Sequence, residues 1–302
     1  MYCTLIHLSG NLMSQKEAVI RNRTFIPLSW ALLMVLMVMP PPGGATDLKP
    51  EAAQGFEQYA RLTELRMQGE LAPGGVFLRV DGLAEPGRGE AHARLQRGEV
   101  ISERLRTLDP TSHASTPGAL IHHWVGTVFV PGASLPQALA LVQDYDHHSE
   151  YYKPEVVKSK TLQHTGNDFK VYLRLKQKKI ITVVLDSEYS VHYRQLDAMR
   201  AIGDSYSTRI AEIAHVDEPG EQASPVDKGE GFLWRLNSYW RFSEANGGVY
   251  IQCQAVSLTR DIPTGLNWLI APFIESIPKE SLEFTLQSTR SAVLRAGLHS
   301  SK

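Results

Sequence analysis

Side chains that could do chemistry are densest in residues 144–152, which hold carboxylate, imidazole and phenol groups in close succession. Oxygen and imidazole groups of this kind can bind a divalent cation. Successive positions on a helix point in different directions, so these groups do not converge on one ion. We therefore predict no metal and no cofactor here. We place Tyr151 and Tyr152 at the mouth of a pocket, because tyrosine combines an apolar ring with a polar tip.

Other motifs with catalytic potential are isolated. Gly203-Asp204-Ser205 has the residues of a hydrolase signature, but that signature follows an N-terminal parallel strand, whereas this triplet lies in a predicted antiparallel strand. The sequence contains no GxSxG, HExxH or P-loop motif. Asp186 and Glu188 share a strand face and could form an acid–base pair, although charged residues commonly occupy the solvated face of a sheet. We predict no catalytic residue.

Strand alternation divides the aromatic side chains of residues 231–243 between two faces. One face carries Phe232, Trp234, Leu236, Ser238, Trp240 and Phe242, and the other carries Leu233, Arg235, Asn237, Tyr239 and Arg241. The first face could line an apolar pocket, form ordinary core or seat the N-terminal segment, and the second could be a polar pocket wall. Alternation does not say which face is concave. It also sends His122 and His123 to opposite faces, so they share no metal ion, and we expect a hydrogen-bonded core histidine there.

These residues lie on strands framed by helices. Periodicity predicts a helix over 135–145, a short helical turn around 148–152 and a long closing helix. The predicted strands are 119–130, 156–164, 168–176, 180–193, 199–214, 231–243 and 249–258. Gly-Asn-Asp at 166–168 and Asn-Gly-Gly at 246–248 are hairpin turns, since glycine and asparagine supply positive φ. Consecutive hairpins favour one antiparallel sheet.

The order of one strand, two helices, six strands and a long helix resembles the START-like superfamily, also called SRPBCC, the polyketide cyclase/dehydrase and lipid-transport group. The resemblance covers roughly residues 118–294, and residues 257–290, with RDIPTGLNWLIAPFIESIPKESLEFTL, resemble bacterial members of unassigned function. It implies an α+β helix-grip fold, in which a curved antiparallel sheet wraps around the C-terminal helix. It also implies a hydrophobic or amphipathic ligand between sheet and helix. A mainly helical N-terminal appendage lies outside the resemblance.

The closing helix has a small, polar face that could border such a cavity. Ser281, Thr285, Ser288 and Ala292 recur at three-to-four spacing, whereas Leu282, Leu286 and Val293 would pack on the sheet. The small face could instead let the helix sit close to the strands. We predict ligand contacts from Tyr151, Tyr152, Trp234, Tyr239, Trp240, Arg241, Ser281, Thr285 and Ser288. Arg241 would bind an anionic headgroup, because a guanidinium offers a planar fork of donors.

The N-terminal end has the order of a secretory signal. Arg21 and Arg23 precede an apolar run at 25–39, which prolines and small residues follow. The run is shorter than the roughly 20 residues that span a bilayer. We predict a signal peptide over 1–45, an appendage over 46–117 and a START-like domain over 118–298, and hence a periplasmic or secreted protein. An uncut membrane anchor is the alternative, and Met13 is an alternative start.

Composition narrows the functional classes. The net charge of −1 gives no overall basic excess for nucleic acid. Two cysteines, Cys3 and Cys253, without a CxxC motif exclude a disulfide framework or a cysteine zinc site. We expect a carrier of a lipid or other hydrophobic small molecule, with no nucleic-acid partner. The basic hairpin end at Arg174, Lys176, Lys178 and Lys179 is either a solvated turn or a point of transient contact with anionic lipid headgroups. The alternatives are a cyclase- or hydrolase-like enzyme with Asp186 in the same cavity, and a filled-core interaction module.

Overall fold

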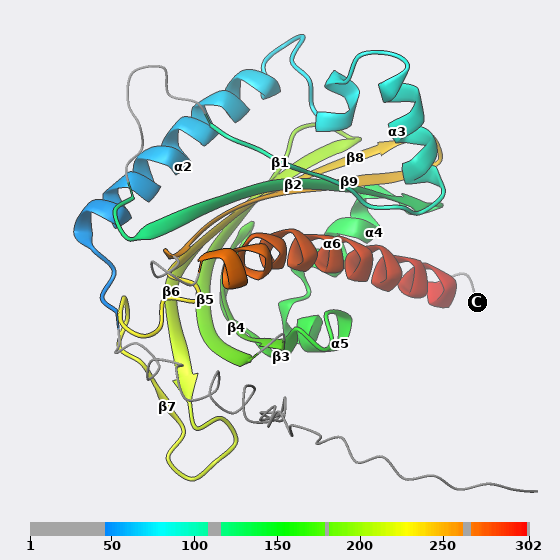
Figure 1. Cartoon of the computed structure of the whole chain (residues 1–302). Coiled ribbons are helices and arrows are strands. Elements are labelled where there is room, and N and C mark those ends of the chain that lie inside the picture. The colour runs from blue at the N-terminus through cyan, green and yellow to red at the C-terminus, as the bar shows by residue number, and fades with distance from the viewer. Residues whose placement is uncertain (1–45, 108–115, 179–180, 262–266, 301–302) are drawn as a thin grey trace, which may run out of the picture. The chain divides into compact units, whose positions relative to one another are not determined.

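The computed structural model describes residues 46–107, 116–178, 181–261 and 267–300, with side chains for all of these except 267–275 and 298–300 (Figure 1). The predicted signal segment at 1–45 and the loop containing Pro263 and Gly265 lie outside the described residues. All described residues belong to one compact unit.

An antiparallel sheet is the main element of this unit. Its strand order is β1-β2-β9-β8-β6-β5-β4-β3, and β7 pairs with β6 off this path. The strands are β1 (Ile101–Arg104), β2 (Ala119–Pro131), β3 (Val156–Thr165), β4 (Asp168–Lys178), β5 (Thr182–Gln195), β6 (Arg200–Ala214), β7 (Gln222–Ala223), β8 (Arg235–Ala245) and β9 (Gly248–Arg260). The predicted hairpins are present, and β2 pairs with β9 along its whole length.

Seven helical segments accompany the sheet. They are α2 (Pro50–Leu71), η1 (Arg79–Gly82), α3 (Gly87–Gln96), α4 (Leu135–Gln143), η2 (Tyr145–His147), α5 (His148–Tyr151) and α6 (Asn267–Ser300), within the described residues. α4 begins at a capping box formed by Ser134 and Gln137. The β8–β9 hairpin turns at Asn246 and Gly247, whose φ angles of 55° and 75° fit the positive φ that a type I′ turn requires at both central positions.

The sheet curves around α6 (Figure 1), so the predicted helix-grip arrangement is confirmed. We call the sheet face toward α6 the inner face. α6 packs most closely on β2, where Gly126 permits the approach: a Cβ at this residue would lie 2.6 Å from Leu286 Cδ1. The core around this contact includes Val128, Val130, Phe169, Val171, Tyr193, Phe242, Ile251, Cys253, Leu282, Leu286 and Val293. Burial of this apolar surface holds α6 against the sheet.

The opposite face, which we call the outer face, is covered by the N-terminal helices (Figure 1). Phe56 of α2 belongs to a buried cluster with Val256 and Leu258 of β9. Leu95 of α3 belongs to a second cluster with Phe129 and Tyr250. β1 pairs with β2, so the N-terminal segment adds a strand to the sheet as well as helices to its outer face. The domain boundary at 117 stays a prediction.

β1 and β3 are the two terminal strands of the sheet. The segment η2–α5 covers part of the β3 edge. The Thr161 N–H donates to Asp146 Oδ1 at 2.7 Å, and the Ser149 N–H donates to Ser159 Oγ at 2.8 Å. Side chains therefore satisfy groups along an edge that would otherwise be open to another strand.

Candidate functional site

The centre of the inner face carries small side chains in a continuous row. Ala255 of β9 pairs with Ser238 of β8, and Ser238 pairs with Ser205 of β6. On the adjoining row, Ser207 Oγ accepts the Leu236 N–H at 2.9 Å. Ala255, Ser238 and Ser205 are each only partly buried. Small side chains fill less of the volume between the sheet and α6 than large side chains would.

Large apolar side chains border this row. Trp124 of β2 pairs with Ala255, and Trp240 lies two residues beyond Ser238 on the same face of β8. The Trp240 and Phe242 rings are stacked, with centroids 6.1 Å apart and planes at 9°. Trp124 and Trp240 are partly exposed although they pack against the main core. Accessible aromatic surface on a concave face is the kind of surface that binds hydrophobic ligands.

Two buried hydrogen-bond donors on the inner face have no acceptor among the described residues. They are Trp124 Nε1 and the Tyr189 hydroxyl. Burial raises the pKa of Tyr189 to about 12, a rise that the nearby Ser187 hydroxyl reduces. The Ser187 hydroxyl donates its own proton to the Leu173 carbonyl at 2.9 Å. An unsatisfied buried donor is costly, typically by about 1–3 kcal/mol, so each could be satisfied by an oxygen of a bound molecule.

The predicted polar face of α6 is directed partly toward β4. Gln177 Nε2 donates to Ser281 Oγ at 2.7 Å, which links α6 to the end of β4. The Thr285 hydroxyl donates to the Ser281 carbonyl at 2.8 Å, so it is satisfied within the helix. Ser288 is partly buried. These three predicted ligand residues therefore lie on one stretch of α6 beside the inner face.

The two predicted mouth tyrosines occupy different environments. Tyr151 is partly buried, and its hydroxyl donates to Asp144 Oδ2 at 2.7 Å. Tyr152 is 5% exposed, and its hydroxyl lies 3.0 Å from Thr289 Oγ1 of α6. Burial raises the pKa of Tyr152 to about 12. Tyr152 therefore lies inside the core and fastens α5 to α6.

Three other predicted ligand residues, Trp234, Tyr239 and Arg241, lie on the outer side of the sheet beneath α2. Tyr239 donates to Glu64 Oε1 at 2.8 Å, and Arg241 Nη2 donates to Glu70 Oε2 at 2.6 Å. Trp234 packs in the cluster that contains Phe56 of α2. It precedes the first residue of β8, Arg235, so the alternation of that strand does not apply to it. The structure does not bring these three residues together with Trp240.

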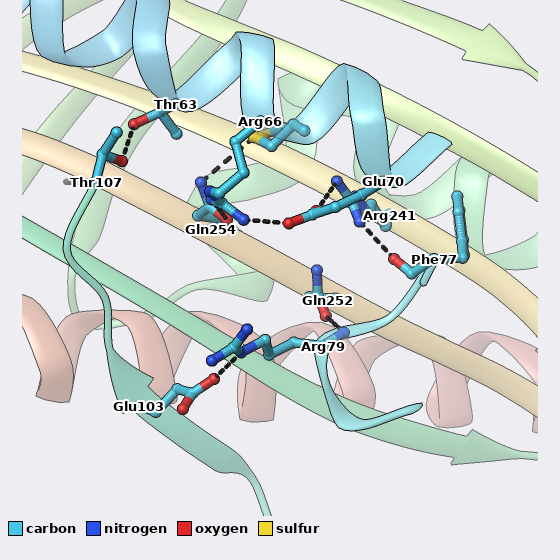
Figure 2. Close-up of polar contacts among 11 residues, drawn as sticks. Thr63, Arg66, Glu70, Phe77, Arg79, Glu103, Thr107, Arg241, Gln252 and Gln254 are labelled. Carbon is cyan, nitrogen blue, oxygen red and sulfur yellow. Dashed lines mark hydrogen bonds and ion pairs between the residues drawn. The ribbon is translucent and has the colours of Figure 1, made fainter. Parts of the chain in front are cut away.

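A layer of polar side chains connects α2 and the following segment to the outer face (Figure 2). Arg66 of α2 donates to Gln254 Oε1 at 3.1 Å and also pairs with Glu70. The Arg79 N–H donates to Gln252 Oε1 at 2.6 Å. Arg241 additionally donates to the Phe77 carbonyl at 2.6 Å. Arg241 is therefore occupied by protein groups and is not available to an anionic headgroup in this structure.

Asp186, the carboxylate of the enzyme alternative, also faces away from α6. It accepts from both Nε and Nη2 of Arg174, at 2.7 and 2.9 Å, and from the Tyr172 hydroxyl at 2.6 Å. Burial alone would raise the pKa of Asp186, but the Arg174 and Tyr172 hydrogen bonds outweigh it and lower the pKa. A carboxylate held in its charged form on the outer face cannot be a base for the inner face.

The consecutive histidines are both buried, in agreement with the expected core histidine. His122 Nε2 lies 2.9 Å from Thr259 Oγ1 on one face, and Tyr59 Oη lies 2.8 Å from His123 Nδ1 on the other. The Tyr59 hydroxyl also accepts the Thr107 N–H at 2.8 Å. Each histidine is thus bound within the protein.

Two of the pockets that described residues line lie away from the space between α6 and the sheet. One, of about 330 Å³, is an open depression at the β8–β9 hairpin, beside Ser134 and Glu244. The other, of about 120 Å³, lies between α2 and the outer face, beside Glu64 and Asp204. Within the described part of the chain, no group of three or more metal-ligating side chains is close enough to hold an ion. In the same part, no helix has the length and hydropathy needed to cross a bilayer.

The topology defines the class of fold: an antiparallel sheet curved around a long C-terminal helix is the helix-grip arrangement of START-like proteins. A STAR-related lipid transfer protein from Xanthomonas axonopodis is similar in structure at 16% identity, over 64% of this chain and 98% of that one, with a TM-score of 0.41. The Zhui aromatase/cyclase from a Streptomyces species is similar at 13% identity, over 58% and 95%, also with a TM-score of 0.41. No family model and no curated protein matches the sequence.

The inner-face residues Trp124, Ser205, Ser238 and Ala255 were not among the predicted site residues. Their small and aromatic types were visible in the sequence. However, the pairings of Trp124 with Ala255 and of Ser205 with Ser238 join strands that are distant in the chain. Only the register places them in one row. Alternation alone already put Ser238 and Trp240 on a common face.

Proposed function

We propose that this protein binds and carries a lipid or other hydrophobic small molecule between the inner face and α6. The observation that carries the proposal is the row Ala255–Ser238–Ser205, which crosses the inner face between the accessible rings of Trp124 and Trp240. Burial of a ligand's apolar surface here would be favourable by about 25 cal/mol per Å², before the costs of association.

The polar groups of the inner face favour a ligand with oxygen acceptors. Trp124 Nε1 and the Tyr189 hydroxyl are donors without an acceptor among the described residues. A ligand carbonyl or hydroxyl would satisfy them and fix its orientation. Similar proteins named for lipid transfer and for aromatase/cyclase activity have the same type of fold. The absence of Asp186 from the inner face supports carriage over acid–base catalysis.

The N-terminal sequence supports export as part of this proposal. We propose cleavage after the apolar run 25–39, with the mature chain in the periplasm or outside the cell. Intact mass of the protein recovered from the secreting cell tests this directly. A mass that still includes Trp30 would contradict cleavage.

A direct test of carriage uses native mass spectrometry of the purified chain, followed by lipid extraction. A co-purified amphiphile, or saturable quenching of tryptophan fluorescence by a panel of hydrophobic ligands, is the expected result. Protein that stays ligand-free and unresponsive to the panel would contradict the proposal.

Larger side chains in the row Ala255–Ser238–Ser205 provide a site-specific test. Ser238→Leu and Ser205→Leu place larger side chains in the space that the ligand would occupy, so affinity should fall at least about tenfold. Ser190→Leu is the matched control, because Ser190 is exposed and lies on the outer face of β5. Equal affinity in all three variants would place the ligand elsewhere.

A further inference from the structure

The β3–β4 hairpin concentrates the positive charge of the chain. Seven of the twelve lysines lie within residues 153–179, together with Arg174, and only Glu155 and Asp168 oppose them. This segment therefore carries a net charge of +6 in a chain whose net charge is −1. A local excess of this size on a nearly neutral protein produces a strong local field.

Strand pairing places five of these lysines on one face. Lys158 pairs with Arg174, and Lys160 pairs with Tyr172, so the β3 lysines share the outer face with the even-numbered residues of β4. We call this set the lysine face: Lys158, Lys160, Lys170, Lys176 and Lys178. Lys176 is partly buried, and the other four are exposed. α2 lies over β2, β9 and β8, so it does not cover these two strands (Figure 1).

The lysines of the lysine face make no close ion pair within the described protein, although Lys158 interacts with the Glu221 carboxylate at longer range. Arg174 is held by Asp186 and Glu221, at 2.7 and 2.8 Å, so these two carboxylates are bound to the arginine. None of the five lysines lies within ion-pair distance of a carboxylate among the described residues. From the sequence we placed Arg174 among the residues that could contact lipid. In the structure it instead balances the charges of Asp186 and Glu221.

Exposed apolar side chains accompany the lysines. Val157 and Leu162 of β3 are 40% and 50% exposed, and Ile181, immediately before β5, is 55% exposed. Leu162 lies in a bulge where the register between β3 and β4 shifts. Lysine with exposed aliphatic side chains suits a lipid surface, because the ammonium groups meet phosphates while the aliphatic groups enter the interface.

We propose that the lysine face is a docking surface for a membrane rich in anionic lipid. The same strand, β4, turns Phe169, Val171 and Leu173 toward the inner face. Because β4 contributes to both the lysine face and the inner face, docking through this hairpin would hold the proposed ligand site close to the bilayer. Nucleic acid is a weaker fit, since the cations of the lysine face are lysines rather than arginines, and Tyr172, the aromatic residue beside them, is partly buried and donates to Asp186.

Vesicle co-sedimentation of the full chain tests the proposal. The protein should bind phosphatidylcholine vesicles that contain about one third phosphatidylserine, release them as salt approaches about 0.5 M, and ignore pure phosphatidylcholine. The triple variant Lys158→Glu, Lys160→Glu, Lys170→Glu should lose at least about tenfold in partition. Leu162→Ser with Ile181→Ser should weaken the binding that survives at intermediate salt.

The matched control reverses three exposed arginines outside the hairpin, Arg61→Glu, Arg106→Glu and Arg295→Glu. It changes the net charge equally and should retain vesicle binding. Circular dichroism verifies that each variant is folded, and hydrophobic-ligand affinity should be unchanged in both. Loss of vesicle binding with ligand affinity intact thus separates docking from carriage. Absent binding to anionic vesicles, equal losses in both triple variants, or salt-sensitive binding to nucleic acid alone would overturn the proposal.

Discussion

Arg241 of β8 and Glu70 of α2 form an ion pair across the outer face, with Arg241 Nη2 2.6 Å from Glu70 Oε2 and the Arg241 side chain 4% exposed. Desolvation lowers the pKa of Arg241, and the Glu70 carboxylate counteracts this effect. The pair therefore offsets the cost of burying the Arg241 charge where α2 contacts the outer face. Because a polar layer surrounds it (Figure 2), the attachment of α2 depends on charge compensation as well as on apolar burial.

Removal of Glu70 alone should be far more damaging than replacement of both partners. Glu70→Ala leaves Arg241 buried without its carboxylate and should lower the free energy of unfolding by about 3 kcal/mol. Arg241→Met should cost less, because Glu70 retains Arg66. The double replacement Glu70→Leu with Arg241→Met should recover most of the loss, as measured by urea unfolding. Additive losses in the double variant would contradict the coupling.

Stability should fall in acid because His123 is buried in its neutral form. Burial lowers the pKa of His123 from 6.5 to about 3, and the nearby Arg66 charge adds to the effect. As pH falls below 6.5, the unfolded chain binds a proton that the folded chain does not, so the free energy of unfolding decreases until the pH approaches 3. At pH 4.5 the loss should be about 3 kcal/mol from this residue.

His123→Gln isolates that contribution. The variant should be slightly less stable than the parent at neutral pH, because the Tyr59 hydrogen bond is altered. Its decline between about pH 7 and pH 4.5 should be smaller by about 3 kcal/mol. His148, whose pKa burial lowers to about 4, should still produce a residual decline. Urea unfolding at a series of pH values measures this, and identical declines in parent and variant would contradict it.

Gly126→Ala should loosen the grip of the sheet on α6. The added Cβ would lie 2.6 Å from Leu286 Cδ1, so we expect a loss of about 1–3 kcal/mol in the free energy of unfolding. The penalty should shrink when Leu286→Ala is also present, because the closest atom is then gone and only Leu282 Cδ2, at 3.3 Å, stays tight against the added Cβ. A double-mutant cycle from thermal or urea unfolding gives this coupling. Independent effects would mean that α6 adjusts elsewhere.

Two buried tyrosines on the inner face should respond oppositely to removal of the hydroxyl. Tyr189→Phe deletes a donor without an acceptor, so stability should stay equal or rise, while affinity for an oxygen-bearing hydrophobic ligand should fall several-fold. Tyr193→Phe deletes a hydroxyl 2.8 Å from that of Tyr145 and should cost about 1 kcal/mol in the free energy of unfolding. Fluorescence titration and urea unfolding separate the two outcomes. A destabilised Tyr189→Phe would show that its hydroxyl is already satisfied.

The arrangement of strands could be predicted because local turn chemistry determines it. Asn246 and Gly247 mark the β8–β9 hairpin through their need for positive φ, and alternation sorted Trp240 from Tyr239 and Arg241. Alternation could not tell which face meets α6, since that depends on where the curved sheet closes. The result is that Tyr239 and Arg241 bind α2, whereas Trp240 faces the inner side.

The candidate site was harder to predict than the fold. Ser205 is far in sequence from Ser238 and Ala255, and the three become neighbours only through the register of three strands. Trp234 was assigned to the face of Trp240 because the predicted strand began four residues too early, at 231 rather than at Arg235. The polar strip on α6 was readable from helical spacing, and Ser281 does meet the end of β4 through Gln177.

The terminal position of β3 gives its lysines a second consequence, in resistance to self-association. An edge strand offers unpaired backbone groups on which another copy could add a strand, and lysine side chains discourage such pairing by repulsion. Neutral replacements at Lys158 and Lys160 would remove this protection along with the positive charge. Glutamate at the same positions preserves like-charge repulsion between copies, so the charge-reversed chain should stay in solution where a neutralised one would aggregate.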